Sequence, residues 1–130
     1  MTENDISQVI GQRVQSMAGV PPIVWGNKDL ANVSRPYLRF EMNPGESAST
    51  PISGGKVQAG FAQVMVVANL DEYETETNTI AANIAALFPY ELSLPCADGK
   101  VTITKHTIPM RGFRDGSDWL KPVQIDYVAV

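Results

Sequence analysis

Residues 57–88 have the sequence VQAGFAQVMVVANLDEYETETNTIAANIAALF, which combines a long strand with a helix. From Val57 onward, alternate side chains point to opposite faces of the strand, and both sets become apolar after Phe61. We therefore expect a central strand over residues 57–68 whose C-terminal end is covered on both faces.

A helix is predicted to follow this strand. Asp71 and Glu74 have the spacing of a capping box, and the acidic residues around them favour the positive end of the helix dipole. Apolar side chains then recur on one helical stripe until Pro89 ends the helix. The stripe consists of Tyr73, Thr77, Ile80, Ile84, Leu87 and Phe88. A strand followed by such a helix is the nucleus of a small α/β domain.

The chain begins with another amphipathic helix. Thr2 is suited to cap its start, and Gly19 and the prolines after it end it. Gly11 inside this helix costs about 1 kcal/mol relative to alanine. We interpret Gly11 as a tolerated weakness rather than as the mark of a close backbone approach. The apolar stripe consists of Ile6, Val9, Ile10, Arg13, Val14 and Met17.

The remaining apolar segments are predicted strands. They cover residues 23–25, 37–42, 92–96, 100–106 and 119–130. Asp98 and Gly99 predict a tight hairpin turn, and Pro122 should lie near the start of the last strand or on a sheet edge. We expect one α+β domain over residues 1–130: an antiparallel or mixed sheet of about five to six strands, with two α-helices packed on one face.

Two segments are predicted loops. Residues 43–55 are dense in Gly, Pro and Ser, and they far exceed the usual two to five residues of a hairpin loop. Such a loop either contacts a partner or is passively flexible, and we favour the contact. Residues 109–118 form a second, charged loop.

The composition excludes several classes of protein. Charged residues make up 18% of the chain, against roughly 25% in typical soluble domains, so the surface suits burial against other subunits or belongs to a lightly charged monomer. The net charge of −4 argues against a basic nucleic-acid-binding surface. Cys96 is alone, which excludes an internal disulfide. We expect no membrane span and no signal peptide, and therefore a cytoplasmic protein.

No motif nominates catalysis, a cofactor or a metal. His106 has no ligand set near it in the sequence, and we interpret it as structural or exposed. Residues 115–118 lack the oxygen ligands of a calcium loop and predict a turn. We therefore expect no catalytic, cofactor-binding or metal-ligating residues, although the residues do not exclude an enzyme.

Taken in order, these features resemble a known family. The segments that carry the likeness are PPIVWGN (21–27), RPYLRF (35–40), GFAQVMVV (60–67), IAALFP (84–89) and DWLKPVQIDY (118–127). They span nearly the whole chain and are similar to the phage tail terminators. That family is the minor tail protein U-like group, which includes prophage and gene transfer agent relatives.

The resemblance implies a structural virion protein without enzymatic activity or cofactors. Tail terminators assemble as a ring, usually a hexamer, which caps the tail tube, stops its polymerisation and joins the head connector. The implied partners are copies of the chain, the tail tube protein and the head–tail connector, with DNA only as passing cargo and no membrane. The implied location is the virion tail, and the host cytoplasm before assembly.

By analogy, both predicted loops contact tube or connector subunits, and charged side chains within and before these loops make subunit or tube contacts. These side chains are Arg35, Arg39, Glu41, Glu46, Arg111, Arg114 and Asp115. Two alternatives stay open. One is a head–tail joining or tail tube protein of the same particle, and the other is a small ligand-binding or enzymatic α/β domain.

Overall fold

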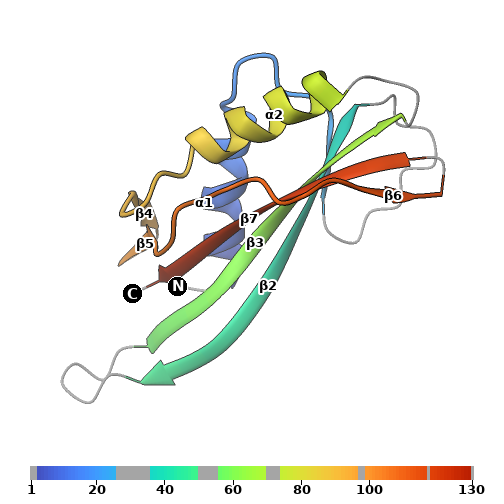
Figure 1. Ribbon diagram of the computed structural model, residues 1–130. Helices are drawn as coiled ribbons and strands as arrows, with labels where there is room; N and C mark the ends of the chain where they lie inside the picture. The colour runs from blue at the N-terminus through green and yellow to red at the C-terminus, as the bar shows by residue number, and fades with distance from the viewer. Residues whose placement is uncertain are drawn as a thin grey trace.

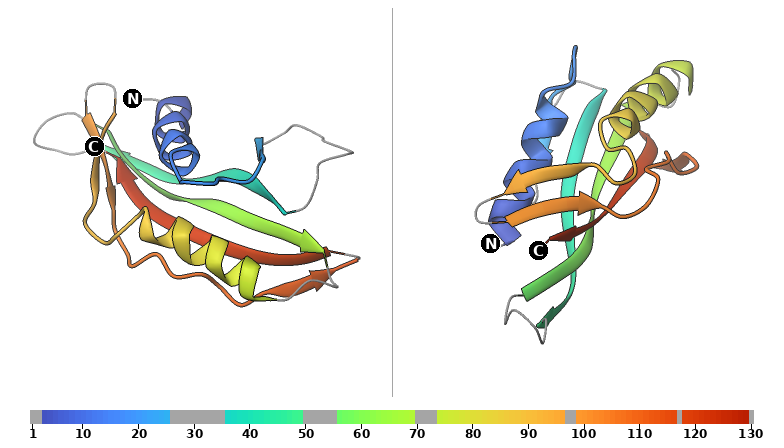
Figure 2. Two further views of the ribbon diagram at one scale, coloured as in Figure 1. Left: turned by 90° about the horizontal axis from the view of Figure 1, so that it is seen from above. Right: turned by 90° about the vertical axis from the view of Figure 1, so that its left-hand side faces the viewer.

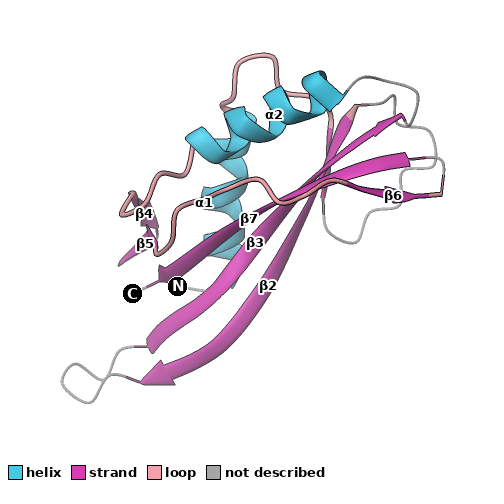
Figure 3. Cartoon of the chain, in the orientation of Figure 1, coloured by secondary structure: helices cyan, strands magenta, loops and turns pink. Residues whose placement is uncertain are grey.

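The computed structural model describes residues 3–25, 36–49, 56–69, 74–96, 99–116 and 118–129. These residues form an α+β fold of two helices and a curled mixed sheet (Figures 1 and 3). The helices are α1 (Glu3–Gln15) and α2 (Glu74–Ala86). The strands are β1 (Ile23–Trp25), β2 (Tyr37–Ser49), β3 (Lys56–Asn69), β4 (Ser93–Cys96), β5 (Gly99–Ile103), β6 (Phe113–Asp115) and β7 (Asp118–Ala129).

The sheet has seven strands in the described part of the chain, one more than the upper end of the predicted range. Its order is β1-β2-β3-β7-β5-β4, and β6 also pairs with β7. β1 is parallel to β2, and every other pairing is antiparallel. The three long strands β2, β3 and β7 form the body of the sheet, and the short strands flank them (Figure 1).

The predicted central strand is confirmed. β3 pairs with β2 along one edge and with β7 along the other. Its inner residues, among them Val64 and Val66, are completely buried. The expected cover of the opposite face is wrong for most of the strand, because Phe61, Gln63 and Met65 are only half-buried there and Val67 alone is buried. Apolar residues alternate on both faces of β3, but most of its outer face is only partly covered by the described chain.

β2 continues through seven residues that were predicted to be loop. The register between β2 and β3 shifts between Pro44 and Ser47, which marks an irregularity and not an end of the strand. β1 pairs with β2 only at residues 38–40, so Pro44 lies beyond this pairing, where a missing N–H is tolerated. A side chain at Gly45 would overlap the carbonyl oxygen of Ala59 on β3. The rest of the predicted loop, residues 50–55, lies outside the described residues.

One buried cluster contains side chains of both helices and of the sheet. Register places on one face of the sheet the alternate side chains Leu38, Phe40, Ala62, Val64, Val66, Val123, Ile125, Tyr127 and Ala129, with Val101 and Ile103 of β5 beside them. α1 contributes Ile6, Ile10 and Val14 to the cluster, whereas Ala81, Ile84 and Phe88 come from α2 and the residues after it. Figure 2 shows α1 toward the β1–β2 side and α2 toward the β7 side.

Both predicted helices form, but α1 ends at Gln15 and α2 at Ala86, each a few residues before the predicted stop, and the interpretation of Gly11 fails. The predicted caps at Thr2 and Asp71 lie outside the described residues, and Thr77 and Ile84 of the α2 stripe are buried as expected. A Cβ at Gly11 would lie 2.8 Å from Cζ3 of Trp25. Gly11 therefore marks a close approach of α1 to the Trp25 ring on β1, and its interpretation as a tolerated weakness is wrong.

The predicted hairpin after α2 forms between β4 and β5. Cys96 pairs with Gly99, so Gly99 belongs to the return strand and not to the turn itself. Cys96 is buried and forms no disulfide, as expected of a lone cysteine that packs as a small apolar side chain.

The predicted charged loop 109–118 contains a strand. β6 pairs with the start of β7, and an isolated bridge joins Pro109 to Val123. Pro122 lies inside β7, opposite Met65, rather than at the beginning of the strand or on an outer edge. Its carbonyl accepts a hydrogen bond from the Met110 N–H at 2.8 Å, so the backbone of Pro122 faces away from β3. The missing N–H therefore breaks no bond of the β3–β7 ladder.

Candidate assembly surface

The outer face of the sheet carries the predicted contact residues of β2. Arg39 and Glu41 are exposed on this face, next to Met65 and Gln63 of β3 in register. The buried cluster that includes the helix side chains lies on the other face. Arg35 lies outside the described residues. Glu46 falls within β2 at the register shift, and its side chain is not among those described.

Register arranges the outer face into rows across the strands. One row joins Tyr37, Val67, Leu120 and Phe113 of β2, β3, β7 and β6 and is apolar. Two other rows are mixed or polar: Glu41, Gln63 and Gln124 form one, and Asn43, Phe61 and Asp126 form the other. The amide of Gln124 donates to the Asp126 carboxylate at 3.2 Å, which orders this polar end. The face thus changes from apolar near β6 to polar near the end of β7.

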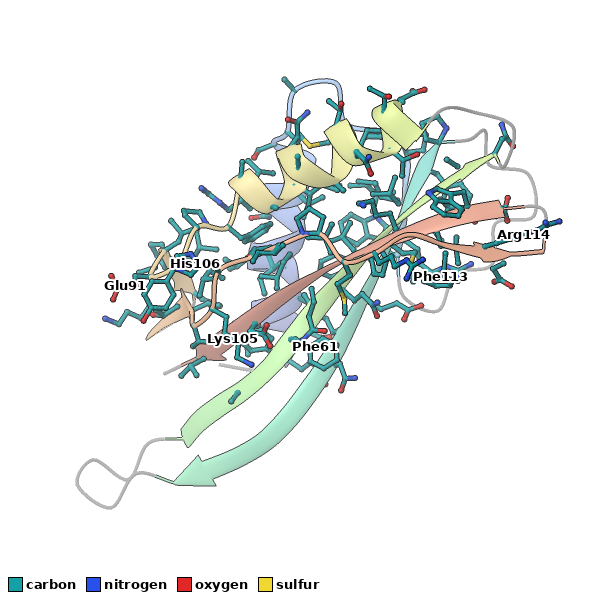
Figure 4. The ribbon with its side chains drawn as sticks, viewed as in Figure 1. Phe61, Glu91, Lys105, His106, Phe113 and Arg114 are labelled. Carbon is teal, nitrogen blue, oxygen red and sulfur yellow. The ribbon has the colours of Figure 1, made fainter. Side chains whose placement is uncertain are left out.

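The segment 108–115 brings together the other predicted contacts. Arg111, Arg114 and Asp115 are all exposed, and the Arg114 Nε donates to the Gly116 carbonyl at 3.2 Å. In Figure 4, Phe113 and Arg114 lie together on β6, at the opposite end of the molecule from His106. The structure therefore unites Arg111 with Arg114 and Asp115 on one short segment, and it places Arg39 and Glu41 on a different strand.

Sequence reasoning missed the apolar part of this segment. The exposed fractions of Ile108, Met110 and Phe113 are 68%, 46% and 44%, in a region that was predicted from its charges alone. The signal was an apolar residue at every second or third position from Ile108 to Phe113, next to the two arginines. Exposed apolar side chains close together are typical of a protein–protein contact.

The segment is held to β7 by backbone and by packing. The Met110 N–H bonds to Pro122, and β6 pairs with residues 118–120. Gly112 is buried against the Trp119 indole, where a Cβ would lie 2.6 Å from Cζ2. The Trp119 Nε1 is buried and has no hydrogen-bond partner in the described part of the chain. Gly112 therefore allows the backbone to lie directly on an aromatic ring, which fixes the position of Met110 and Phe113.

The described residues form no candidate site of another kind. His106 stacks on the Tyr90 ring with the ring centroids 5.0 Å apart. Within the described ranges, no three acidic, histidine or cysteine side chains come together in a way that could hold a metal ion. Neither α1 nor α2 is long and apolar enough to cross a membrane. Burial, with the charge of Glu3, raises the pKa of Tyr127, a core side chain.

Comparison with known proteins identifies the family. A model of phage tail terminator proteins matches residues 5–127. The chain belongs to the phage tail terminator family. The tail terminator family is a family of structural virion proteins, so the chain is a structural protein of the phage tail. A search of curated proteins finds no significant match.

Solved structures share the fold of this tail terminator. One, which is named only by a sequence identifier, has a TM-score of 0.80 and 22% identity, and the alignment covers 100% of this chain and 96% of that chain. Another comes from the virion of a native gene transfer agent particle, with a TM-score of 0.65 and 12% identity over 98% of this chain and 95% of that chain. At these identities the likeness concerns the fold alone.

Proposed function

We propose that the protein terminates the tail tube. Copies close into a ring, taken as a hexamer, which caps the end of the tube, stops its polymerisation and offers a surface to the head connector. The observation that carries this proposal is the tail terminator family match over residues 5–127. The proposal treats residues 1–130 as one domain in which both helices cover the same sheet face, as their shared buried cluster supports.

The proposed partners follow from this position in the particle. They are other copies of the chain, the tail tube protein and the head–tail connector, with DNA only as cargo through the ring and no membrane. A structure of similar fold that comes from a virion particle supports assembly with other virion proteins. The protein would be present in the host cytoplasm before assembly and in the virion tail afterwards, and it would carry out no catalysis.

The surface of the molecule is suited to such contacts. Charged residues make up only 18% of the chain, so much of its surface can be desolvated at modest cost. The outer sheet face and the segment 108–115 place apolar side chains beside exposed charges, as the polar rim and apolar core of interfaces require. We assign intersubunit or tube contacts to Arg35, Arg39, Glu41, Glu46, Arg111, Arg114 and Asp115.

Tube growth in the presence of the protein tests this function. Purified tail tube protein would be polymerised with and without the chain, and tube lengths would be measured by negative-stain electron microscopy. We expect tubes that stop growing when the protein is added, with a ring of density at one end. A heat-denatured sample of the same protein is the control.

Two outcomes would contradict the proposal. Tubes that grow to the same length with and without the protein would exclude a terminator. Long open-ended tubes formed by the protein alone would identify it as a tube subunit.

A further inference from the structure

We propose that two opposite edges of the domain bind each other between neighbouring copies. The first is the basic edge, defined as residues 105–114, which runs beside β7 into β6. The second is the amide groove between α1 and β1, lined by Asn4, Ser7, Gln8, Gln12, Gln15 and Trp25, with Gly11 beside the tryptophan. The occupant of the groove is the basic edge of a second copy. This inference rests on the proposed ring, because it names the surfaces through which the ring closes.

The two surfaces lie on opposite sides of the molecule. β1 is the first strand in the sheet order, and β6 pairs with the far side of β7. In Figure 1 the segment that leads into β6 passes in front of the sheet, whereas α1 lies behind it. Figure 2 shows the same separation from above, with α1 at one side and β6 at the other. One copy can therefore use both surfaces at once, for two different neighbours.

The basic edge offers apolar side chains beside positive charge. Ile108, Met110 and Phe113 are each at least 44% exposed. Residues 105–114 hold three basic residues and no acidic one, in a chain whose net charge is −4, and the exposed Asp115 follows them. The basic residues are Lys105, Arg111 and Arg114, and all three are exposed.

The amide groove is lined by uncharged side chains, and acidic residues flank it in the first turn of α1. Residues 1–12 hold two acidic residues and no basic one, and the acidic residues, Glu3 and Asp5, lie in the first turn of α1. Arg13, the first cation of the chain, is turned away, since its Nε donates to the Leu87 carbonyl and its guanidinium lies 6.0 Å from the Phe88 ring centroid. The half-buried Trp25 supplies an aromatic surface for Met110 or Phe113 of the neighbour.

Both surfaces also end in strand edges. The Pro22 carbonyl accepts from the Leu38 N–H at 2.8 Å, and backbone groups alternate in direction along a strand, so those of Ile23 point away from β2. β6 pairs with β7 on one side, and no described strand pairs with its other side. Edge strands with free backbone groups favour pairing with another chain.

Charge and position together select a second copy as the occupant. A surface that is basic and apolar meets a neutral groove that is flanked by the acidic first turn of α1, so opposite charges approach each other at that end, whereas two basic edges brought face to face would repel. Different patches on opposite sides give a head-to-tail contact, which closes into a ring if the rotation per copy allows it. A two-fold dimer through identical patches is excluded by this arrangement.

A pair of substitutions at one exposed position tests the charge argument. Gln12 lines the groove on the exposed side of α1, and Gln, Arg and Glu have nearly equal helix propensities. We expect Gln12→Arg to weaken association between copies about two- to fivefold and Gln12→Glu to strengthen it, as surface charges of this kind do. Association would be measured by sedimentation velocity over a range of concentrations at low salt. Equal effects of Gln12→Arg and Gln12→Glu would overturn the proposal.

Covalent trapping tests the geometry. A protein with both Gln12→Cys and Met110→Cys should form a ladder of disulfide-linked oligomers under mild oxidation, because each copy then links to two neighbours. An equimolar mixture of the two single variants should stop at linked dimers. Cys96 is buried and provides an inert background in wild type. Linked dimers from the Met110→Cys protein alone, at the yield of the mixture, would overturn the head-to-tail arrangement.

The failure of this inference can be separated from failure of the proposed function. If the wild-type protein stops tube growth but the Gln12→Arg and Gln12→Glu proteins associate as wild type does, and the Gln12→Cys and Met110→Cys proteins form no more linked oligomer than wild type does, another pair of surfaces closes the ring. If the wild-type protein leaves tube growth unchanged and stays monomeric with and without tube protein, the proposed function and this inference both fail.

Discussion

Gly112→Ala tests how the exposed segment is attached to the sheet. A Cβ at this position would lie 2.6, 2.8 and 2.9 Å from Cζ2, Cε2 and Nε1 of Trp119. Carbon atoms pack at about 3.5–4.0 Å, so the indole or the backbone must move by roughly 1 Å. Overpacking of this kind lowers the free energy of unfolding by about 1–3 kcal/mol.

The same substitution should change sign when the indole is removed. Gly112 does not have a positive φ, so alanine fits its backbone, and a Trp119→Leu background removes the indole that holds the three atoms nearest to the new methyl group. Gly112→Ala should then stabilise the protein by about 0.4–1 kcal/mol, because alanine restricts the unfolded chain. The free energy of coupling between the two positions is therefore expected to exceed about 1 kcal/mol.

Urea unfolding of the four proteins at 25 °C, followed by far-UV circular dichroism, measures this coupling. Wild type, the two single variants and the double variant form a closed cycle, and equal m-values would show that the unfolding transition is comparable in each. If Gly112→Ala costs the same with and without the indole, the packing of Gly112 on Trp119 is not what holds the segment, and the reasoning is refuted.

Three further predictions concern the core. Phe88→Ala should lower the free energy of unfolding by about 3–5 kcal/mol in urea titrations, since the ring is completely buried, and a loss below 1 kcal/mol would contradict its place in the core. Arg13→Lys should lower the free energy of unfolding nearly as much as Arg13→Met, by about 1–3 kcal/mol in thermal unfolding. The reason is that the Arg13 Nε donates to the Leu87 carbonyl, and lysine has no donor at that position. A lysine variant as stable as wild type would show that only the charge matters. Burial, with the charge of Glu3, raises the pKa of Tyr127 above 10.0 in the folded state, so the unfolded chain releases this proton first as pH rises. The stability due to Tyr127 is therefore present below pH 10.0 and lost above it. Tyr127→Phe should lessen the fall in the free energy of unfolding between pH 9 and 11, about one unit on each side of the ordinary pKa. An equal fall in wild type and Tyr127→Phe would contradict the burial of the phenol.

The elements that follow from local pattern were predicted well. The stripe of α1, the stripe of α2 around Ile84, and the alternation of Val123, Ile125 and Tyr127 in β7 all appear in the buried cluster. Each pattern expresses the geometry of its own segment, 3.6 residues per turn or two residues per strand repeat, and therefore needs no knowledge of distant residues.

The errors fall where pairing with distant residues prevails over local preference. Pro44 and Gly45 predict a loop, yet β2 continues because β3 pairs with it on both sides of the register shift. β6 has no apolar alternation of its own and is a strand because residues 118–120 of β7 pair with it. Gly11 looks like an ordinary cost to a helix until the Trp25 ring is placed against it.

The same distinction applies to the candidate surface: some of its features could be predicted from the sequence, and others could not. The charges of Arg111 and Arg114, the low overall charge and the missing catalytic motifs are visible in the order of residues, because they depend only on composition and local spacing. The exposure of Met110 and Phe113, and the position of their segment on the edge opposite α1, depend on which strands pair across the sheet. Those pairings join residues far apart in the chain, and only the folded molecule brings them together.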